Sequence, residues 1–528
     1  MPARLLFTAP ARRGFPRFPG GLASPAAVLL VLLTCAAAAA APTTAPFAIR
    51  AVDEATGRGV PLVELRTTSN VSFWTDSNGL VAIFDPGLMN QRVYFHVFSH
   101  GYEYPADGFG FRGTVLEVKP GGRATLPLKR INIAQRLYRI TGEGIYHDSV
   151  ILGHPVPSAA PVLNAQVTGQ DSVQAAVYRG RIWWFWGDTN RLSYPLGHFG
   201  TAGATSDLPS AGGLDPSVGV NLNYFTDERG FSRPMCDLPG DGMKWIDGLM
   251  VVPDETGRQR LLAAYARMKS LDKCLERGLM VFDDDAGRFR RVAQFPVDTL
   301  LRPCGQAFTV QEQGETYVYF ATALPVVRVK ADFRSVTDLG LYEGFTCLKP
   351  GSRFDAGAPA LDRDAAGRLV WAWKRATDPT GQAQQQQLIS SGAMKPEEAW
   401  FAVRDVVSAR PVRIHNGSVR YNAFRKRYVM IATEEGGASS FLGEVWYSEA
   451  QRPEGPWKWA RKILTHDRYS FYNPVHHAFF DQQGGRVIYF EGTYSHTFSR
   501  QDQPTPRYDY NQIMYSLDLA DPRLALPE

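Results

Sequence analysis

Short stretches in which apolar and polar residues alternate dominate this chain, and they come in pairs joined by tight turns. Alternation with a period of two residues is typical of β-strands with one buried face. Beyond residue 161 we count six such hairpins. They start at Asp171, Asp247, Gly305, Gly357, Asn416 and Asn473, with spacings of 76, 58, 52, 59 and 57 residues.

A repeat of about 50 residues that holds four strand-sized segments is typical of a β-propeller. The sequence therefore predicts an all-β protein with a five- or six-bladed β-propeller over residues 161–528, since one of the six hairpins could be an addition to a five-bladed ring. A strand at 144–146 is expected to close the ring, and a helical insert is expected at 383–400. A stack of several sandwiched sheets is the alternative architecture.

The most informative hairpin spans residues 169–189. Its first strand is small and apolar, and its second strand is rich in aromatic residues and ends in Gly-Asp-Thr. In an antiparallel pair, the start of the first strand and the end of the second lie at the same edge. Asp171 and Asp188 are therefore expected side by side, although an Asp at either position could serve only to shape a turn.

The same geometry applies to every blade of a propeller, so polar residues at strand starts and at the ends of second strands would gather around one funnel. A buried carboxylate without a function is costly there. The candidates at strand starts are Asp171, Asp247, Gln306, His415, Asn416, Tyr472, Asn473 and His476. The candidates at strand ends are Asp188, Arg267, Lys374, Arg375, Glu434, Glu435, Glu491 and Tyr494.

Hydrolysis of a glycosidic bond requires one carboxylate as base or nucleophile and one carboxylic acid that keeps its proton. We expect Asp171 to be the base, Glu491 the acid and Asp247 a third carboxylate that raises the pKa of the acid by charge repulsion. Asp188 belongs to the same catalytic set, and Glu434 is the main rival for the acid. The residues expected to bind the substrate are Trp186, Trp245, Arg267, Lys374, Asn416, Tyr472, His476 and Tyr494.

Residues 47–130 form a separate unit with its own alternating segments. The turn Asp53-Glu-Ala-Thr-Gly57, the hairpin Thr75-Asp-Ser-Asn-Gly79 and the strand end His100-Gly-Tyr102 resemble the carboxypeptidase-regulatory-like or transthyretin-like family. That resemblance implies a small β-sandwich with a structural or carbohydrate-proximal role and no chemistry of its own. Residues 131–160 are expected to connect this unit to the propeller.

The first 41 residues are expected to be an export signal, because a basic stretch precedes a short apolar run and an alanine tract. The Arg12-Arg13 pair is similar to a twin-arginine signal, which exports folded proteins, and an ordinary secretory signal is the alternative. Cleavage would remove four Arg and no acid, which reduces the formal charge from +5 to +1. We therefore expect a periplasmic or extracellular protein with a carbohydrate substrate, no nucleic-acid partner and no transmembrane segment after cleavage, and no oligomeric state is predicted.

Four cysteines remain after cleavage: Cys236, Cys274, Cys304 and Cys347. An even number in an exported protein permits disulfides, and four buried thiols are the alternative. Their spacings match no zinc pattern, and no Asp-rich loop requires calcium, although a calcium ion on the propeller axis would suit the family described next. No cofactor is otherwise expected.

The segments Gln170-Asp171-Ser172 and Phe185-Trp186-Gly187-Asp188-Thr189 resemble the first blade of glycoside-hydrolase-like propellers, the clan of arabinanases, xylosidases and levansucrases and a related family of secreted arabinan-degrading enzymes. The resemblance implies that Asp171 and Asp188 lie in the active site. That clan typically has five blades, whereas six hairpins are counted here.

Of three other functions, a sialidase is not supported, and two remain open. A sialidase would carry S-x-D-x-G-x-x-W boxes, and residues 161–528 contain none. A polysaccharide lyase could use Lys374, Arg375 or Arg267 to neutralise a uronate and His476 or Tyr472 as the base, and the same cations would suit a hydrolase of acidic sugars. A propeller that binds carbohydrate or protein without catalysis is the third alternative.

Overall fold

The computed structural model describes residues 45–499, 501 and 503–527, so the expected export signal at 1–41 lies outside the described residues. The prediction of an all-β protein is confirmed, because strands make up almost all of the regular structure. None of the helices in the described part of the chain is long and apolar enough to cross a bilayer.

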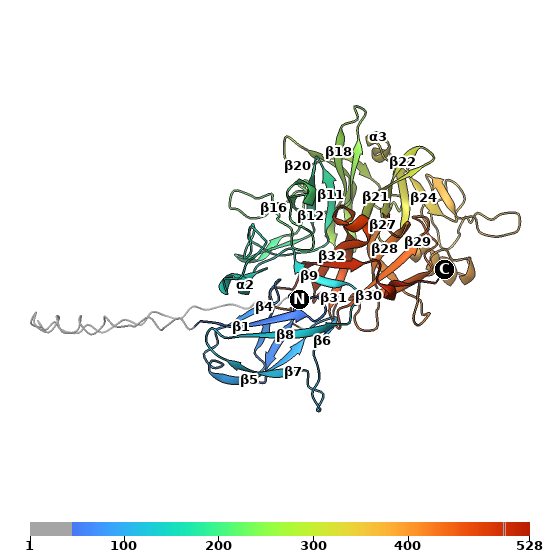
Figure 1. Cartoon of the computed structure of the whole chain (residues 1–528). Helices are drawn as coiled ribbons and strands as arrows, with labels where there is room; N and C mark the ends of the chain where they lie inside the picture. Colours follow the sequence, from blue (N-terminus) through green and yellow to red (C-terminus); the bar gives the residue numbers. More distant parts are fainter. Residues whose placement is uncertain (1–44, 500, 502, 528) are drawn as a thin grey trace, which may run out of the picture. The chain divides into compact units, whose positions relative to one another are not determined.

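Residues 47–130 build two four-stranded sheets, in blue and cyan in Figure 1. One sheet has the order β4 (Leu80–Ile83), β1 (Phe47–Asp53), β8 (Arg123–Arg130) and β6 (Tyr102–Glu103). The other has the order β3 (Ser72–Trp74), β2 (Glu64–Thr67), β5 (Gln91–Phe98) and β7 (Gly113–Val118). Alternate apolar residues of both sheets, such as Ile49 and Phe95, share one buried core.

Five larger sheets follow along the chain, and each begins with an antiparallel hairpin. The first sheet contains β11 (Gln174–Tyr178), β12 (Arg181–Trp186), β15 (Ala202–Asp207) and β16 (Asn223–Tyr224). The second contains β17 (Met243–Pro253), β18 (Gln259–Ser270), β19 (Lys273–Asp283) and β20 (Arg288–Phe295). The third contains β21 (Gln306–Glu312), β22 (Glu315–Ala321), β23 (Pro325–Lys330), β24 (Glu343–Thr346) and β25 (Ala372–Arg375). The fourth sheet contains β27 (Ile414–Asn422), β28 (Arg427–Glu434), β29 (Glu444–Ala450), β30 (Trp459–Thr465) and β26 (Arg404–Asp405). The fifth contains β31 (Ser470–His476), β32 (Val487–Ser495), β33 (Asn511–Asp518) and β9 (Gln135–Arg139).

The remaining elements are short. A small sheet contains β10 (Val167–Gln170), β13 (Thr189–Arg191) and β14 (Tyr194–His198). The α-helices are α2 (His147–Ile151), α3 (Phe333–Thr337) and α4 (Gln382–Ser390). The 3-10 turns are η1 (Pro209–Ala211), η2 (Leu339–Leu341), η3 (Pro396–Glu398), η4 (Ala478–Phe480), η5 (Gln483–Gly485) and η6 (Pro522–Leu524). Helix α4 and turn η3 occupy the segment where the sequence predicts a helical insert.

The first strands of the five large sheets contact one another in succession, β11 with β17, β17 with β21, β21 with β27 and β27 with β31 (Figure 1). The fifth sheet returns to the first through two hydrogen bonds. The backbone N–H of Ser172 donates to Thr493 Oγ1 at 3.0 Å, and Asn473 Nδ2 donates to Ser172 Oγ at 2.8 Å. The starts of these strands therefore lie near one another although they are far apart in the sequence.

Two details of the predicted repeat are wrong. The hairpin expected at residues 356–375 is not a sheet of its own, because only β25 forms there and it pairs with β24 as the outermost strand of the third sheet. The strand expected at 144–146 is a turn before α2, with Gly144 at φ 67°. Strand β9, which starts nine residues before Gly144, completes the fifth sheet by pairing with β33.

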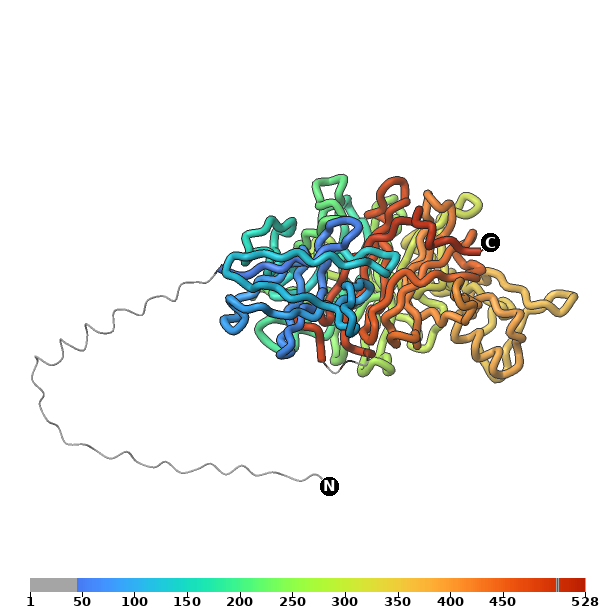
Figure 2. Tube along the Cα trace, turned by 60° about the horizontal axis from the view of Figure 1, so that its bottom comes forward, coloured from blue at the N-terminus to red at the C-terminus, as the bar shows by residue number. Residues whose placement is uncertain are grey.

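The unit at residues 47–130 packs directly against the fifth sheet, as the tube in Figure 2 also shows for the blue and red segments. The buried Tyr508 hydroxyl accepts a hydrogen bond from the Leu62 N–H at 3.2 Å and donates to the Thr75 carbonyl at 2.6 Å. His100 Nε2 lies 3.0 Å from the Tyr494 hydroxyl. Burial of these polar groups is tolerated because each has a partner.

We expect Tyr508→Phe to destabilise the protein by about 0.5–1.5 kcal/mol, because it removes the hydroxyl that bonds both the Leu62 N–H and the Thr75 carbonyl, while these two groups stay bonded to each other at 3.1 Å. The measurement is the thermal and urea unfolding midpoint of purified protein. Tyr421→Phe is the matched control, since that tyrosine is 55% exposed and should shift neither midpoint. Equal midpoints for Tyr508→Phe and wild type would contradict the prediction.

Candidate active site

The first strands share an irregularity at the positions where the sequence predicts functional residues. The pairing register shifts between Asp247 and Met250 in β17, between Ile414 and Gly417 in β27, and between Tyr472 and Val475 in β31. Left-handed backbone occurs at Ser172 (φ 56°), Gly248 (φ 54°) and Asn473 (φ 51°). Bulges of this kind redirect side chains and are frequent beside active sites.

A chain of hydrogen bonds links three of these strand starts. Asn416 Nδ2 donates to Asn473 Oδ1 at 2.8 Å, and Asn473 in turn donates to Ser172 Oγ. The Ser172 hydroxyl donates to Asp171 Oδ2 at 3.1 Å. The fourth, fifth and first sheets therefore contribute side chains to one continuous polar site.

Asp247 joins the first three sheets. Its Oδ1 atom accepts hydrogen bonds from Gln174 Nε2 at 3.2 Å, from the Gly248 N–H at 2.9 Å and from the Gly305 N–H at 2.8 Å. Burial raises the pKa of Asp247, whereas the Gly305 N–H and the nearby Arg302 oppose that rise. Gln306, predicted at the start of the third sheet, donates to the Val173 carbonyl at 3.0 Å.

Asp171 lies directly against the end of β12, as its place in the hairpin predicts. Its carbonyl accepts the Gly187 N–H at 2.7 Å, and a Cβ at position 187 would lie 2.3 Å from Asp171 Oδ1. Only glycine therefore leaves room for this carboxylate. The Tyr472 hydroxyl donates to Asp171 Oδ2 at 3.2 Å. Burial raises the pKa of Asp171, and the hydroxyls of Tyr510, Ser172 and Tyr472 work against that rise by stabilising the ionised form.

Asp188 follows Gly187 and lies on the same side as Asp171. The indole N–H of Trp245 donates to Asp188 Oδ1 at 2.7 Å. The pKa of Asp188 is raised to about 7, mainly by burial; the Trp245 N–H opposes this rise and the negative charge of Asp171 contributes to it. The site therefore holds one carboxyl group that keeps its proton close to neutral pH beside another that hydroxyl groups stabilise in its ionised form.

Glu491 does not reach this site. Strand β32 continues to Ser495, so Glu491 lies inside the sheet opposite Val475 rather than at its end. Its side chain has no solvent exposure, its Oε1 atom lies 2.7 Å from His477 Nε2, and its Oε2 atom has no hydrogen-bond partner in the described chain. Burial raises the pKa of Glu491 to about 8. The raised pKa suits an acid, but a substrate cannot contact this carboxyl group.

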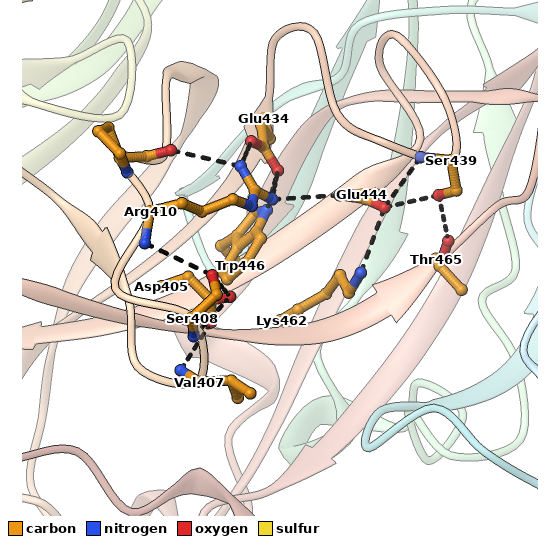
Figure 3. A network of polar contacts seen from close by, with 11 residues as sticks. Asp405, Val407, Ser408, Arg410, Glu434, Ser439, Glu444, Trp446, Lys462 and Thr465 are labelled. Atoms are coloured by element: carbon orange, nitrogen blue, oxygen red, sulfur yellow. Dashed lines mark hydrogen bonds and ion pairs between the residues drawn. The ribbon is translucent and has the colours of Figure 1, made fainter.

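Glu434 ends β28 as predicted, but it belongs to an ion-pair network shown in Figure 3. The Arg410 guanidinium binds both carboxylate oxygens, and Trp446 Nε1 donates to Oε2 at 2.9 Å. The neighbouring Glu444 accepts from Ser439 Oγ at 2.6 Å and lies 3.2 Å from Lys462 Nζ. Both carboxylate oxygens of Glu434 are therefore engaged by Arg410 and Trp446.

The expected cations Arg267 and Lys374, and the imidazole of His476, are likewise paired with other groups of the protein. Arg267 pairs with Glu276 at 3.3 Å. Lys374 is buried and binds Asp362 Oδ2 at 2.8 Å and the Leu348 carbonyl at 2.6 Å. His476 is buried with its Nε2 atom 2.7 Å from Asp481. These groups stabilise the sheets and loops around them.

The aromatic candidates separate into two groups. Trp245 and Tyr472 contact the carboxylates of the site. Trp186 is 1% exposed and stacks on Trp184 with a centroid distance of 6.4 Å, so it belongs to the core. Tyr494 is fully buried against Tyr469 and His100 and therefore faces the unit at 47–130.

Three residues of the site were not predicted as such. Gln174 is a polar residue in a small apolar strand, and that contrast was a usable signal. Ser172 sits at the strained position directly after Asp171. Tyr510 precedes the outer strand β33, and its carbonyl accepts the Gln170 N–H at 2.7 Å. No pattern of strand starts could indicate Tyr510, because it approaches from outside the hairpin.

The four cysteines are free thiols, so the disulfides that their even number permits do not form. Within the described residues no group of three or more His, Cys, Asp or Glu side chains is placed to hold a metal ion.

Comparison with known proteins gives structural likenesses only. No family model matches the chain, and no curated protein matches it. Similar solved structures include an exo-β-1,3-galactanase from Phanerochaete chrysosporium with β-1,3-galactotriose (9% identity, 75% of this chain, 67% of that chain, TM-score 0.35). Another is the GH43_1 enzyme of Xanthomonas citri with xylose (12% identity, 69% of this chain, 92% of that chain, TM-score 0.35). A third is RS223-β-xylosidase (12% identity, 66% of this chain, 92% of that chain, TM-score 0.34).

The pKa of Asp188 predicts a pH-dependent stability. In the unfolded chain Asp188 ionises near its ordinary pKa of 3.8, whereas in the folded protein it keeps its proton until about pH 7. Its contribution to stability is therefore complete below the unfolded pKa and is lost as the pH rises to about 7. Asp188→Asn cannot ionise, so its unfolding free energy should fall less between about pH 4 and pH 8, by on the order of 1–2 kcal/mol.

The measurement is urea unfolding at a series of pH values for wild type and Asp188→Asn. Asp467→Asn, at an exposed position outside the site, is the control and should follow wild type. Parallel pH curves for wild type and Asp188→Asn would show that Asp188 titrates normally in the folded protein.

Proposed function

We propose that the five large sheets are the blades of a five-bladed β-propeller, preceded by a β-sandwich domain at residues 47–130. Each large sheet begins with a hairpin, and the first strands contact one another in succession. The fifth sheet combines β9, from before the first large sheet, with the last strand of the chain. A ring closed by strands from both sides of the repeat accounts for these contacts.

We infer that the chain is a glycoside hydrolase, exported as its first 41 residues suggest, that acts on a carbohydrate. The observation that carries this inference is the pair Asp171 and Asp188. Burial raises the pKa of both, to about 7 for Asp188, and three hydroxyl groups oppose that rise at Asp171. Two neighbouring carboxyl groups with pKa values driven apart are the general requirement for acid and base roles at one glycosidic bond.

Asp188 is the proton donor in this proposal, because burial keeps its carboxyl group protonated close to neutral pH. Asp171 is the base or nucleophile, because three hydroxyl groups stabilise its ionised form. Asp247 holds the surrounding strand starts together and adds negative charge. Glu491 and Glu434 have no part in the reaction, since one is enclosed in the sheet and the other is bound by Arg410.

Groups that could bind the sugar surround the two aspartates. Trp245 supplies aromatic surface next to Asp188, and Asn416 and Asn473 supply amide groups, whereas Tyr472 is buried and supplies its hydroxyl to Asp171. Aromatic rings beside a small number of polar groups are a common way to bind sugars and other small ligands. Trp186, Arg267, Lys374, His476 and Tyr494 are left out of this set because their side chains are buried or paired elsewhere.

A carbohydrate-binding propeller without catalysis is the second candidate. The observation that favours it is the third sheet, which begins with Gly305 and Gln306 where an additional acid could have stood. The lyase alternative receives no such support, since Lys374 and Arg267 are paired with carboxylates and His476 with Asp481.

Asp171→Asn and Asp188→Asn should each lower kcat by at least about 100-fold on any glycan or aryl glycoside that the wild-type protein cleaves, because each removes one partner of the acid–base pair. The measurement is release of reducing sugar or of the aryl group from a panel of neutral and acidic substrates. Glu491→Gln is the control with a buried carboxyl group, and it should keep kcat within about 10-fold if it folds.

Three outcomes would overturn parts of this assignment. Activity that survives in Asp171→Asn and Asp188→Asn excludes these residues as catalysts. Activity lost only in Glu491→Gln would assign the acid role to that residue. Binding of glycans by the wild type with no cleavage of the panel would support the second candidate.

Trp245→Phe should move the alkaline limb of the pH–rate profile to higher pH. The substitution removes the N–H that lowers the pKa of Asp188, so the proton of that acid is held to a higher pH. Trp183→Phe is the control, because the Trp183 N–H donates to the Tyr178 carbonyl instead. An unchanged limb in Trp245→Phe would mean that Asp188 does not set it.

A further inference from the structure

Two arginines without a counter-ion, Arg277 and Arg302, lie near Asp247, at the same end of the second and third sheets. Arg277 is in β19 and pairs with Ala266, which pairs with Trp245, so the side chains of Trp245 and Arg277 leave the same face of the sheet. Arg302 is in the segment before β21. That segment packs on Gly248 through Pro303 and donates the Gly305 N–H to Asp247.

Neither guanidinium has an acidic partner. Within the described residues no carboxylate lies within 4.0 Å of Arg277 or Arg302, and the buried Nε of Arg277 has no hydrogen-bond partner. Two other arginines of the second sheet behave differently, because Arg267 and Arg291 both bind Glu276, at 3.3 and 2.6 Å. Arg277 and Arg302 therefore lack a carboxylate partner because of their own position, and not because the second sheet lacks acidic residues.

The two charges also act on each other. Burial and the nearby Arg302 both lower the pKa of Arg277, which is the effect expected when two cations approach without an anion between them. Both arginines lower the pKa of Asp247, but its Oδ1 atom already accepts three N–H groups. Positive charge consequently remains unneutralised beside the proposed reaction site.

We propose that Arg277 and Arg302 bind the carboxylate of a uronic acid residue in the glycan substrate. This inference rests on the proposed function in one respect, namely that the aspartates mark where the glycan binds. A planar guanidinium binds a carboxylate through two parallel hydrogen bonds, and two guanidinium groups can hold both oxygens of one sugar carboxylate. An anion bound here would relieve the repulsion between the arginines.

The proposal changes which cations confer a preference for acidic sugars. The sequence favours Arg267, Lys374 and Arg375 for that role, but Glu276 and Asp362 already neutralise the first two. Arg375 donates its Nε–H to the Gly340 carbonyl, at the outer edge of the third sheet. Arg277 and Arg302 lie instead next to Asp247.

The experiment measures binding to the purified protein by calorimetry and saturation-transfer NMR. The probes are D-glucuronate, D-galacturonate, their methyl esters, D-galactose and D-galactose 6-sulfate. The variants are Arg277→Gln, Arg302→Gln and the control Arg291→Gln, which keeps both arginines of the site. Unfolding midpoints confirm that each variant is folded.

We expect a uronate to bind at least about 10-fold more tightly than its methyl ester, and each site variant to lose about 10-fold or more of that affinity while Arg291→Gln keeps it. Equal binding of acid and ester, or unchanged binding in both site variants, would overturn the proposal. Binding of the sulfate but of neither uronate would overturn the assignment to a carboxylate.

The two proposals fail in different ways. Cleavage of glycans by the wild type, together with uronate binding that is equal in wild type, Arg277→Gln and Arg302→Gln, would remove the uronate site and leave the hydrolase intact. Uronate binding that depends on these arginines, in a protein that cleaves no glycan, would support the binding site and remove the hydrolase.

Discussion

The arrangement of the site depends on one buried carboxylate oxygen. Asp247 Oδ1 accepts hydrogen bonds from a side chain of the first sheet, from its own neighbour in the second and from the backbone that begins the third. Since a charge-assisted bond to a buried carboxylate is costly to lose, these contacts fix the three strand starts relative to one another. Asp171, Asp188 and the unpaired arginines all take their positions from strands held in this way.

The parts of this arrangement that follow from short-range sequence could be predicted. The hairpin at 169–189 brings Asp171 against Gly187 because its register is set by a tight turn and by alternating side chains. The repeat of hairpins likewise indicated all-β structure, but Asp247, Asn416 and Asn473, predicted at strand starts, lie inside β17, β27 and β31 where the pairing register shifts. In each case the signal and its consequence lie within about 20 residues or follow from simple repetition.

The parts that failed depend on register and on distant partners. Glu491 was expected at a strand end, but β32 runs four residues further, to Ser495, and encloses it. Glu434 is at the predicted strand end, yet Arg410 from the preceding loop neutralises it. The hairpin expected at 356–375 alternates correctly, but its last strand is taken up by the third sheet. Nothing in the sequence around Arg277 indicates that it lacks a carboxylate partner, and nothing around Tyr510 indicates that it lies next to Asp171.

The pairing of β9 with β33 constrains the order in which the chain can fold. Thr141, just after β9, bonds Asn511 at the start of β33 across 370 residues, so the fifth sheet stays incomplete until synthesis is almost finished. Closing so long a loop is slow compared with forming a hairpin. The fifth sheet is therefore completed late, and truncation after residue 510 would remove β33 and leave both β9 and β32 without a pairing partner on that side.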